Sequence, residues 1–471
     1  MKNLLQRMAR RDGLLWLGLG AWSLTLAIRL RDYWFDDPAI TYRYAQNIAS
    51  GAGFIYQRGE QVLGTTTPLY ALLLSGLYFA SNHLPQVSVA VSALAILGCG
   101  VLVFLLCGRH YLGAVAGTMV VTDLFFVQSV GMEVPLFGFL TLLGVAFFEK
   151  GYLGRTGLVA GLATLTRPDG VVLAGITGLV ALIRNKRFPF SLAGFYLLVL
   201  LPWIVFATTY FGSPLPNTLA AKAQTVSPTL LIAHLADIPG QYVAWNPLYM
   251  IVPVALAFSL RRSMNLVPWA WILAILLGYV VVAPFLQFWY VSSLVPMLGV
   301  LVGRGLVEMR DYTSLVLGEN KRFTGKVVSV FLVLLLAPIP LKAGWDCLHL
   351  IRTPPHNITY ENIGVWLRAN VPDDALVMAE DVGIIGYLSG KRMLDTFALV
   401  SPQMLDHEGD FLYGVSRYLP EYILVKQCCA AKMEALKKSG WLGAIYFPAA
   451  QFGTPGDRLS PQIVYSGKLP A

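Results

Sequence analysis

Apolar residues fill most of the chain in runs of roughly 17 to 22, long enough to cross a bilayer as helices. Glycine or a short basic cluster separates one run from the next. In a helix every backbone polar group is paired internally, so such runs are stable in hydrocarbon. The pattern therefore predicts a multispan α-helical membrane protein.

The distribution of lysine and arginine predicts the topology, because these residues concentrate in cytoplasmic loops. We expect a cytoplasmic N-terminus and about 11 spans, with 68–80 too short to cross and placed as a helix at the outer interface. A twelfth span at 68–80 would instead put Arg109 outside. The expected spans are 14–30, 87–107, 111–128, 135–148, a short pair around the sequence RPDG at 167–170, 188–210, 247–260, 266–283, 288–303 and 325–341.

The pattern changes after residue 341. The stretch 360–370 has helical periodicity, whereas 375–379, 422–425 and 443–447 are short strand-like runs separated by turn residues. We therefore expect two domains: a transmembrane catalytic module, 1–341, whose first outer loop is 31–86, and a small extracytoplasmic α/β domain, 342–471.

Composition agrees with this division. Of the 471 residues, 56% are hydrophobic and 13% are charged, far less charge than in a soluble domain. The net charge of +9 lies mostly in short loops between spans, so it indicates topology rather than nucleic-acid binding. Five cysteines have no metal-site spacing; Cys347 could pair with Cys428 or Cys429, or all three could be unpaired.

The unusual polar residues fall on the side predicted to be outside. Ionisable groups at bilayer level are costly unless they line a cavity or meet a ligand, so their clustering indicates a site near the outer interface. The candidates are Asp36, Asp37, Glu133, Arg167, Asn217, Lys222 and Gln287.

The adjacent carboxylates Asp36 and Asp37 have two interpretations. Either residue before Pro38 suits the N-cap of a helix at 38–50. Alternatively, one carboxylate deprotonates an acceptor hydroxyl while the other orients it. The two roles are compatible, because a cap needs only one carboxylate.

The other charged candidates also have a structural alternative. Glu133 could cap a helix that begins near Pro135, or it could position an acceptor or a divalent metal. Arg167 could be an interfacial arginine, or its guanidinium could grip a phosphate. Lys222 follows a Pro-rich turn and would supply a second cation for the same phosphate.

Aromatic residues near the predicted interface, among them Tyr42 and Tyr290, more often form a membrane-interface belt than a sugar platform. The six histidines have no metal spacing, and no nucleotide-binding or nucleophile-elbow motif has the context it requires.

The segment FDDPAITYRYAQNIASGAGFIYQRGEQVLGTTTPLYALLL resembles the first outer loop of GT-C superfamily glycosyltransferases, the multispan enzymes that use polyprenyl-phosphate sugars. GMEVPLF, LTRPDG, FGSPLPNTLAAKA and FWYVSSLVPML are similar to later motifs of the bacterial arabinofuranosyl- and mannosyltransferase-like group. The resemblance covers nearly the whole chain in order. Thr65-Thr66-Thr67 departs from the usual motif, which puts the contacts there in doubt.

The resemblance implies transfer of a sugar from a polyprenyl-phosphate donor to an envelope glycan, lipid or protein acceptor outside the cytoplasmic membrane. It implies catalytic roles for Asp36 as base, Asp37 as its partner and Glu133. It also implies donor-phosphate contacts from Arg167 and Lys222. Acceptor or sugar contacts are expected from Tyr42, Asn217, Gln287 and Tyr290.

Two other classes remain open. A lipid or solute transporter would also carry charges at bilayer level, but it predicts interrupted helices in two related halves. A non-catalytic envelope scaffold would not need both carboxylates.

Overall fold

The computed structural model describes residues 2–222, 227–282, 287–317, 321–426, 430–440, 444–453 and 462–467. The chain forms two compact units. The helical unit contains residues 1–31, 88–202 and 225–351, and the mixed unit contains residues 32–87, 203–224 and 352–471. The mixed unit thus combines the first loop segment with the C-terminal segment. The division at 341/342 expected from the sequence stays a prediction.

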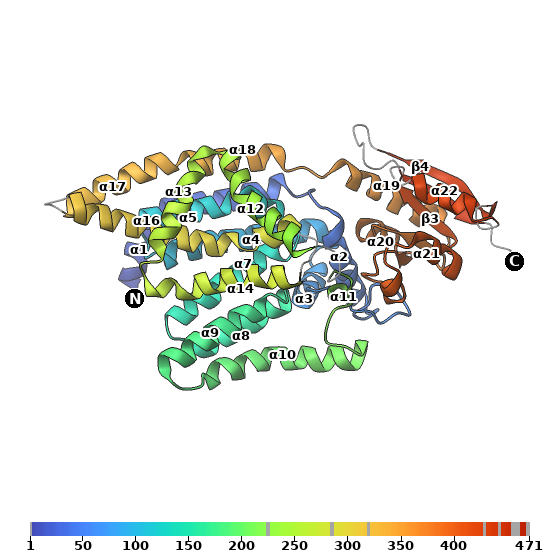
Figure 1. Ribbon diagram of the computed structural model, residues 1–471, viewed down its shortest axis with the longest axis horizontal. Coiled ribbons are helices and arrows are strands. Elements are labelled where there is room, and N and C mark those ends of the chain that lie inside the picture. The colour runs from blue at the N-terminus through green and yellow to red at the C-terminus, as the bar shows by residue number, and fades with distance from the viewer. Residues whose placement is uncertain are drawn as a thin grey trace. The chain divides into compact units, whose positions relative to one another are not determined.

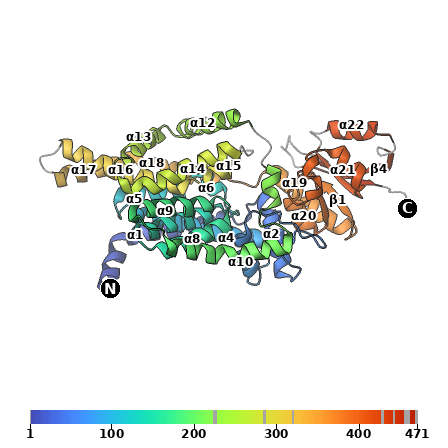
Figure 2. The same cartoon turned by 60° about the horizontal axis from the view of Figure 1, so that its bottom comes forward.

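The helical unit is built from the apolar runs (Figure 1). α7, α8 and α9 lie side by side in both views of the ribbon (Figure 2). The helices that lie wholly or mainly in this unit are α1 (Lys2–Arg29), α4 (Leu84–Leu106), α5 (Tyr111–Val121), α6 (Leu124–Gln128), α7 (Val134–Glu149), α8 (Leu153–Thr166), α9 (Gly170–Asn185), α10 (Phe190–Phe211), α12 (Pro228–Trp245), η1 (Pro247–Met250), α13 (Ile251–Ser259), η2 (Ser263–Asn265), α14 (Leu266–Val282), α15 (Phe288–Ser292), α16 (Val295–Leu317), α17 (Lys321–Leu336) and α18 (Pro338–Leu350).

Helices long and apolar enough to cross a membrane lie at 84–106, 190–211, 263–281 and 323–370 among the described residues. Shorter apolar helices follow most of the other expected spans. The chain is a membrane protein, and the predicted number of about 11 spans stays a prediction. The expected span 111–128 is not one helix: the side chain of Asp123 accepts the Phe126 N–H at 2.9 Å and starts α6 after α5 has ended.

The mixed unit holds the expected α/β structure. Its sheet has the order β2-β1-β3-β5-β4, with β2, β1 and β3 parallel and the other two pairs antiparallel. The strands are β1 (Leu376–Ala379), β2 (Arg392–Asp395), β3 (Tyr422–Lys426), β4 (Tyr446–Phe452) and β5 (Gln462–Gly467). The helices are α2 (Asp36–Ala49), α3 (Pro68–Tyr78), α11 (Asn217–Lys222), α19 (Pro355–Asn370), α20 (Gly383–Ser389), η3 (Pro402–His407), α21 (Phe411–Tyr418) and α22 (Ala430–Lys438).

Buried strand residues pack with helix residues to form the core of the mixed unit. Met378 of β1 and Ile423 of β3 lie beside Val415 of α21 and are at most 1% exposed. Strands buried on both faces read as continuous apolar runs, which is why β1 and β3 were recognisable in the sequence. The sequence prediction did not include β2 and β5.

Cys347 is free and buried in the helical unit, where its thiol contacts the Thr122 carbonyl oxygen at 3.3 Å. Cys428 and Cys429 lie outside the described residues.

Candidate functional site

The residues singled out in the sequence form one cluster in each unit. Glu133, Arg167 and Tyr290 come together in the helical unit, whereas Asp36 and Asp37 begin α2 in the mixed unit. Each cluster has its own charge balance.

Arg167 is the centre of the helical-unit cluster, in the turn between α8 and α9, and is only 6% exposed. Its Nη1 donates to Oε1 of Glu133 at 2.9 Å. Its Nε and Nη2 donate to Oδ2 of Asp169 at 3.2 and 3.1 Å. Glu133 occupies the N-cap position of α7, but its side chain makes no capping hydrogen bond. The capping interpretation of Glu133 is therefore wrong, and its carboxylate pairs with the arginine.

Aromatic rings enclose this ion-pair network. The Arg167 guanidinium carbon lies 5.6 Å from the centre of the Tyr290 ring and 5.8 Å from that of Phe137. The Tyr279 hydroxyl donates to Asp169 at 3.3 Å, and its ring meets Tyr290 edge-on at 5.4 Å. Low dielectric around a charged group strengthens its electrostatic interactions and makes an unpaired charge costly. The network is therefore rigid and depends on all three charges.

The charge balance limits what this cluster can bind. One guanidinium faces two carboxylates, so the three groups carry a formal charge of −1. Three of the five guanidinium N–H groups are used by Glu133 and Asp169, which leaves two as donors. An anionic ligand at this cluster would need a further cation. Gln287, at the N-cap position of α15, is partly exposed and makes no capping bond through its side chain.

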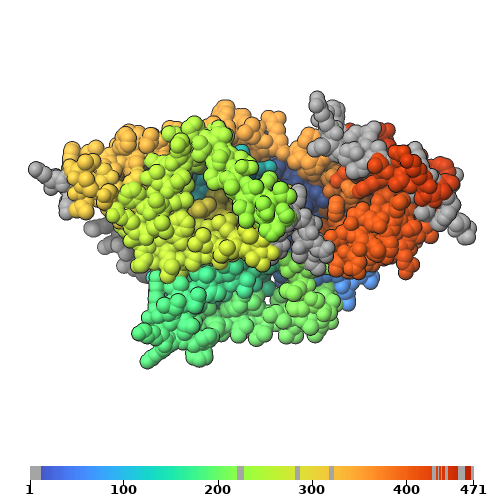
Figure 3. Space-filling view, in the orientation of Figure 1, coloured from blue at the N-terminus to red at the C-terminus, as the bar shows by residue number. Residues whose placement is uncertain are grey.

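The helical unit also contains an apolar cavity of about 310 Å³, next to α5, α12, α13 and α16. The space-filling view shows the surface hollowed beside the green α12–α13 segment (Figure 3). Tyr242 and Val302 line it, and the Tyr242 hydroxyl donates to Oδ2 of Asp123 at 2.9 Å. The cavity is suited to a hydrocarbon group.

In the mixed unit, Asp36 is held by the N-terminus of another helix. Phe35 is the N-cap of α2, and Asp36 and Asp37 both lie in its first turn, so the expectation that one of them is the N-cap is wrong. Oδ1 of Asp36 accepts the Ile384 N–H at 2.8 Å, and Oδ2 accepts the Gly383 N–H at 3.1 Å. These are the first two residues of α20, whose free N–H groups and positive dipole end favour a carboxylate.

The sheet explains why α20 begins there. β1 ends at Ala379, and after a three-residue turn the chain enters α20. Gly383 is required by the close approach of α2: a Cβ at this position would lie 1.9 Å from the main-chain oxygen of Asp36. In parallel sheets, ligand-binding groups collect at the carboxyl ends of the strands, and Asp36 lies at such an end.

Burial and, after it, the nearby charge of Asp381 raise the pKa of Asp36 to about 8; Asp37 adds to the rise, while the two backbone N–H groups oppose it. Asp381 is itself fixed, because its Oδ2 accepts the Tyr360 hydroxyl at 2.8 Å and the Lys426 ammonium at 2.6 Å. Asp36 is therefore a partly buried, positioned carboxyl group that exchanges its proton near neutral pH.

Three other candidates of the mixed unit have different surroundings. Tyr42 is fully buried on α2 and its ring meets Tyr387 of α20 edge-on at 6.0 Å, and its predicted contact with sugar or acceptor stays a prediction. Asn217 donates from its side chain to the Ala398 carbonyl oxygen, which fixes the start of α11. Lys222 ends α11, and its side chain lies outside the described part of the chain.

Sequence reasoning missed the residues around Asp36. Gly383 and Ile384 bind it through their N–H groups, Asp381 raises its pKa, and Lys426 pairs with Asp381. One signal was present: β1 is followed directly by two acidic residues and a glycine, in the sequence AEDVG. Polar residues and glycine after a buried strand are typical of a site at a strand end. Within the described residues, no group of three or more His, Cys, Asp or Glu side chains could hold a metal ion.

The arrangement of the whole chain matches solved structures. ArnT from Cupriavidus metallidurans bound to undecaprenyl phosphate aligns with a TM-score of 0.63 and 13% identity, over 97% of this chain and 98% of that one. The same protein in the apo state aligns with a TM-score of 0.62. This chain has the fold of ArnT. The GT-C-like fold and the small C-terminal sheet expected from the sequence are therefore confirmed.

A glycosyltransferase also matches part of this chain in sequence. The terminal beta-(1->2)-arabinofuranosyltransferase of Mycobacterium tuberculosis (strain ATCC 25618 / H37Rv) is 25% identical over an aligned length of 277 residues, and the alignment covers 52% of this chain and 43% of that protein. The chain thus aligns with less than half of the length of that relative. Residues 351–463 match a family model described as a domain of unknown function (DUF8728).

Proposed function

We propose that the protein is a membrane glycosyltransferase that moves a sugar from a polyprenyl-phosphate donor to an extracytoplasmic acceptor. The observation that carries this proposal is Asp36: a carboxyl group with a pKa of about 8, held in place by two backbone N–H groups. A general base works best when its pKa lies near the operating pH. The ArnT fold and the arabinofuranosyltransferase relative favour glycosyl transfer as the reaction.

In the proposed reaction, Asp36 takes the proton of an acceptor hydroxyl as that oxygen forms a bond to the anomeric carbon. The bond from this carbon to the phosphate oxygen breaks, and its electron pair leaves with the polyprenyl phosphate. Asp37, the next residue in the first turn of α2, orients the acceptor hydroxyl. Glu133 is held by Arg167 and contributes a second acidic group.

The leaving phosphate needs positive charge, because fixed charges that face the developing anion stabilise the transition state. We assign this role to Lys222 and to the two N–H groups of Arg167 that its carboxylate partners leave free. Gln287, Tyr290 and Asn217 are the remaining proposed contacts of sugar or acceptor. The apolar cavity beside Tyr242 fits part of the polyprenyl chain.

The experiment is a release assay with purified protein in lipid. It is supplied in turn with polyprenyl-phosphate sugars, including the arabinofuranosyl donor, and with membrane-extracted acceptors, and free polyprenyl phosphate is followed by mass spectrometry. Release that depends on both donor and acceptor and disappears in the Asp36→Asn variant supports the proposal. Folded protein that releases nothing with any donor and acceptor pair contradicts it.

A further inference from the structure

A second, larger cavity in the helical unit is separate from the Arg167 cluster. Its volume is about 1030 Å³, and it lies among the first residues of α5, the chain just after α13, the C-terminal part of α16 and the N-terminal part of α17. Small-molecule sites typically measure about 300–1,000 Å³. The cavity is therefore large enough for a lipid headgroup.

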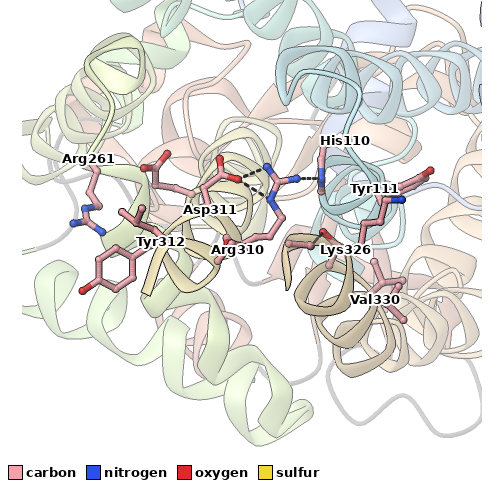
Figure 4. A pocket seen from close by; sticks show the side chains of 14 residues that line it. His110, Tyr111, Arg261, Arg310, Asp311, Tyr312, Lys326 and Val330 are labelled. Atoms are coloured by element: carbon pink, nitrogen blue, oxygen red, sulfur yellow. Dashed lines mark hydrogen bonds and ion pairs between the residues drawn. The ribbon is translucent and has the colours of Figure 1, made fainter. Parts of the chain in front are cut away.

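Basic side chains outnumber acidic ones in its lining (Figure 4). The Arg310 guanidinium lies between the carboxylate of Asp311, with Nε to Oδ1 at 2.8 Å, and the ring of His110. Arg262 pairs with Glu308 and, at 3.3 Å, with Asp311. Both carboxylates are thus already paired with arginine.

Two further cations line the cavity without a carboxylate of their own. The guanidinium of Arg261 lies 4.4 Å from the centre of the Tyr312 ring, and Lys326 is exposed on α17. Neither has an ion pair with an acidic side chain among the described residues. The lining thus has three cations, Arg261, Arg310 and Lys326, against the two carboxylates of Glu308 and Asp311, which leaves a formal charge of +1, so the cavity is complementary to an anion.

One wall of the same cavity is apolar and faces outward. Leu315 of α16 and Val330 of α17 line it and are 61% and 58% exposed. The exposed apolar surface continues along α17 through Phe331 and Leu334, inside a stretch that is long and apolar enough to span a membrane. A cationic recess beside an apolar helix face fits a molecule with an anionic head and a hydrocarbon tail.

We propose that this cavity binds the phosphate headgroup of an anionic phospholipid, with Lys326 beside the phosphate, Arg261 adding positive charge at the other end of the cavity, and an acyl chain along α17. Ammonium and guanidinium groups form strong, charge-assisted hydrogen bonds to phosphate oxygens. Basic recesses between membrane helices are suited to such headgroups, and each cation near a phosphate surface adds to the attraction. This site does not depend on the proposed transferase reaction.

Native mass spectrometry of the delipidated full chain tests the proposal. Dioleoyl-phosphatidylglycerol and dioleoyl-phosphatidylcholine are titrated separately, and inorganic phosphate is added in a third arm as competitor. Wild-type protein is expected to retain phosphatidylglycerol preferentially. The double variant Arg261→Gln/Lys326→Gln is expected to bind it about 25-fold more weakly, because two positive charges of the cavity lining are lost. Arg187→Gln, which removes an exposed cation between α9 and α10, is the matched control and should bind as wild type.

Three results overturn the proposal. Equal retention of the two lipids would show that the cavity does not select an anionic head. Unchanged affinity in the double variant, with its thermal unfolding as in wild type, would place the lipid elsewhere. Displacement of phosphatidylglycerol by inorganic phosphate at equal concentration would identify a site for free anions. If the double variant fails to fold, the single variant Lys326→Gln, on an exposed position, gives the same comparison.

Discussion

Replacing Asp36 by asparagine separates the chemistry of its carboxyl group from its contact with α20. Asparagine has the same shape, so its carbonyl oxygen can keep the bond to the Ile384 N–H, while its amide nitrogen faces the N–H of Gly383. A buried donor left without an acceptor costs about 1–3 kcal/mol. In the other direction, the amide carries no charge. It therefore avoids the cost of burying a charge and the repulsion from Asp381, the two effects that raise the pKa of Asp36. The variant is therefore expected to fold.

Its activity is expected to fall far more than its stability. Loss of a general base typically costs about 10²–10⁴ in rate. The assay measures release of polyprenyl phosphate by wild type, by Asp36→Asn and by Asp32→Asn, which removes an exposed carboxylate four residues earlier that accepts a hydrogen bond from Gln86. Thermal unfolding of each protein reports folding. A folded Asp36→Asn variant that keeps more than about a tenth of the wild-type rate would refute the assignment of Asp36 as base.

The remaining predictions concern the groups around these carboxylates. The transfer rate should rise about tenfold per pH unit up to about pH 8 and then level off, because Asp36 acts as a base only when it is ionised. Asp381→Asn should move this rise to lower pH, and a rate–pH profile unchanged in that variant would contradict the influence of Asp381. The pKa of Asp36 is raised in the folded state above its ordinary value of about 3.9, so the folded state binds the proton more tightly than the unfolded state does. The contribution of Asp36 to the free energy of unfolding should therefore fall between about pH 4 and 8, and denaturant titrations of Asp36→Asn should lack this fall. Gly383→Ala should lower both the unfolding temperature and the transfer rate, since a Cβ would meet the main chain of Asp36, whereas Gly175→Ala, with open space around it, should change neither. Arg167→Lys should abolish transfer and destabilise the helical unit by about 3–5 kcal/mol, because one ammonium cannot pair with both the buried Glu133 and the half-buried Asp169 at the spacing of the guanidinium; a thermal unfolding curve like that of wild type would contradict this.

The helices were predictable because the apolar residues that form each one lie in one continuous stretch of sequence. The apolar runs expected at 188–210 and 266–283 correspond closely to α10 (Phe190–Phe211) and α14 (Leu266–Val282). The break between α5 and α6 was not predicted, since only two polar residues mark it inside an apolar run: Thr122 is the C-cap of α5 and Asp123 the N-cap of α6. β2 is as short as β1, but its sequence RMLD begins and ends with a charged residue, so it has no continuous apolar run that marks a strand.

The environment of Asp36 was not predictable for a different reason. Its importance was visible locally, as one of two acidic residues at the start of an expected helix. Its hydrogen-bond partners, however, are 347 and 348 residues away in the chain. A local pattern can predict where a helix begins, but it cannot predict which distant helix N-terminus binds a given carboxylate. For the same reason the sequence suggested a cap for Glu133, while the structure pairs it with Arg167, 34 residues later.

The C-terminal segment stabilises the first loop, which carries Asp36, through buried hydrogen bonds. Besides the two N–H groups of α20, the Tyr56 hydroxyl donates to the Val382 carbonyl oxygen at 2.6 Å, and the Gln57 side chain accepts the Met393 N–H at 2.7 Å. These bonds are buried, so breaking them leaves unpaired polar groups on both sides. A chain without residues 352–471 would lose every one of these partners and the neighbouring charge of Asp381. The pKa of Asp36, and with it the pH range in which it can act as a base, therefore depends on the segment 351–463 that matches the family model.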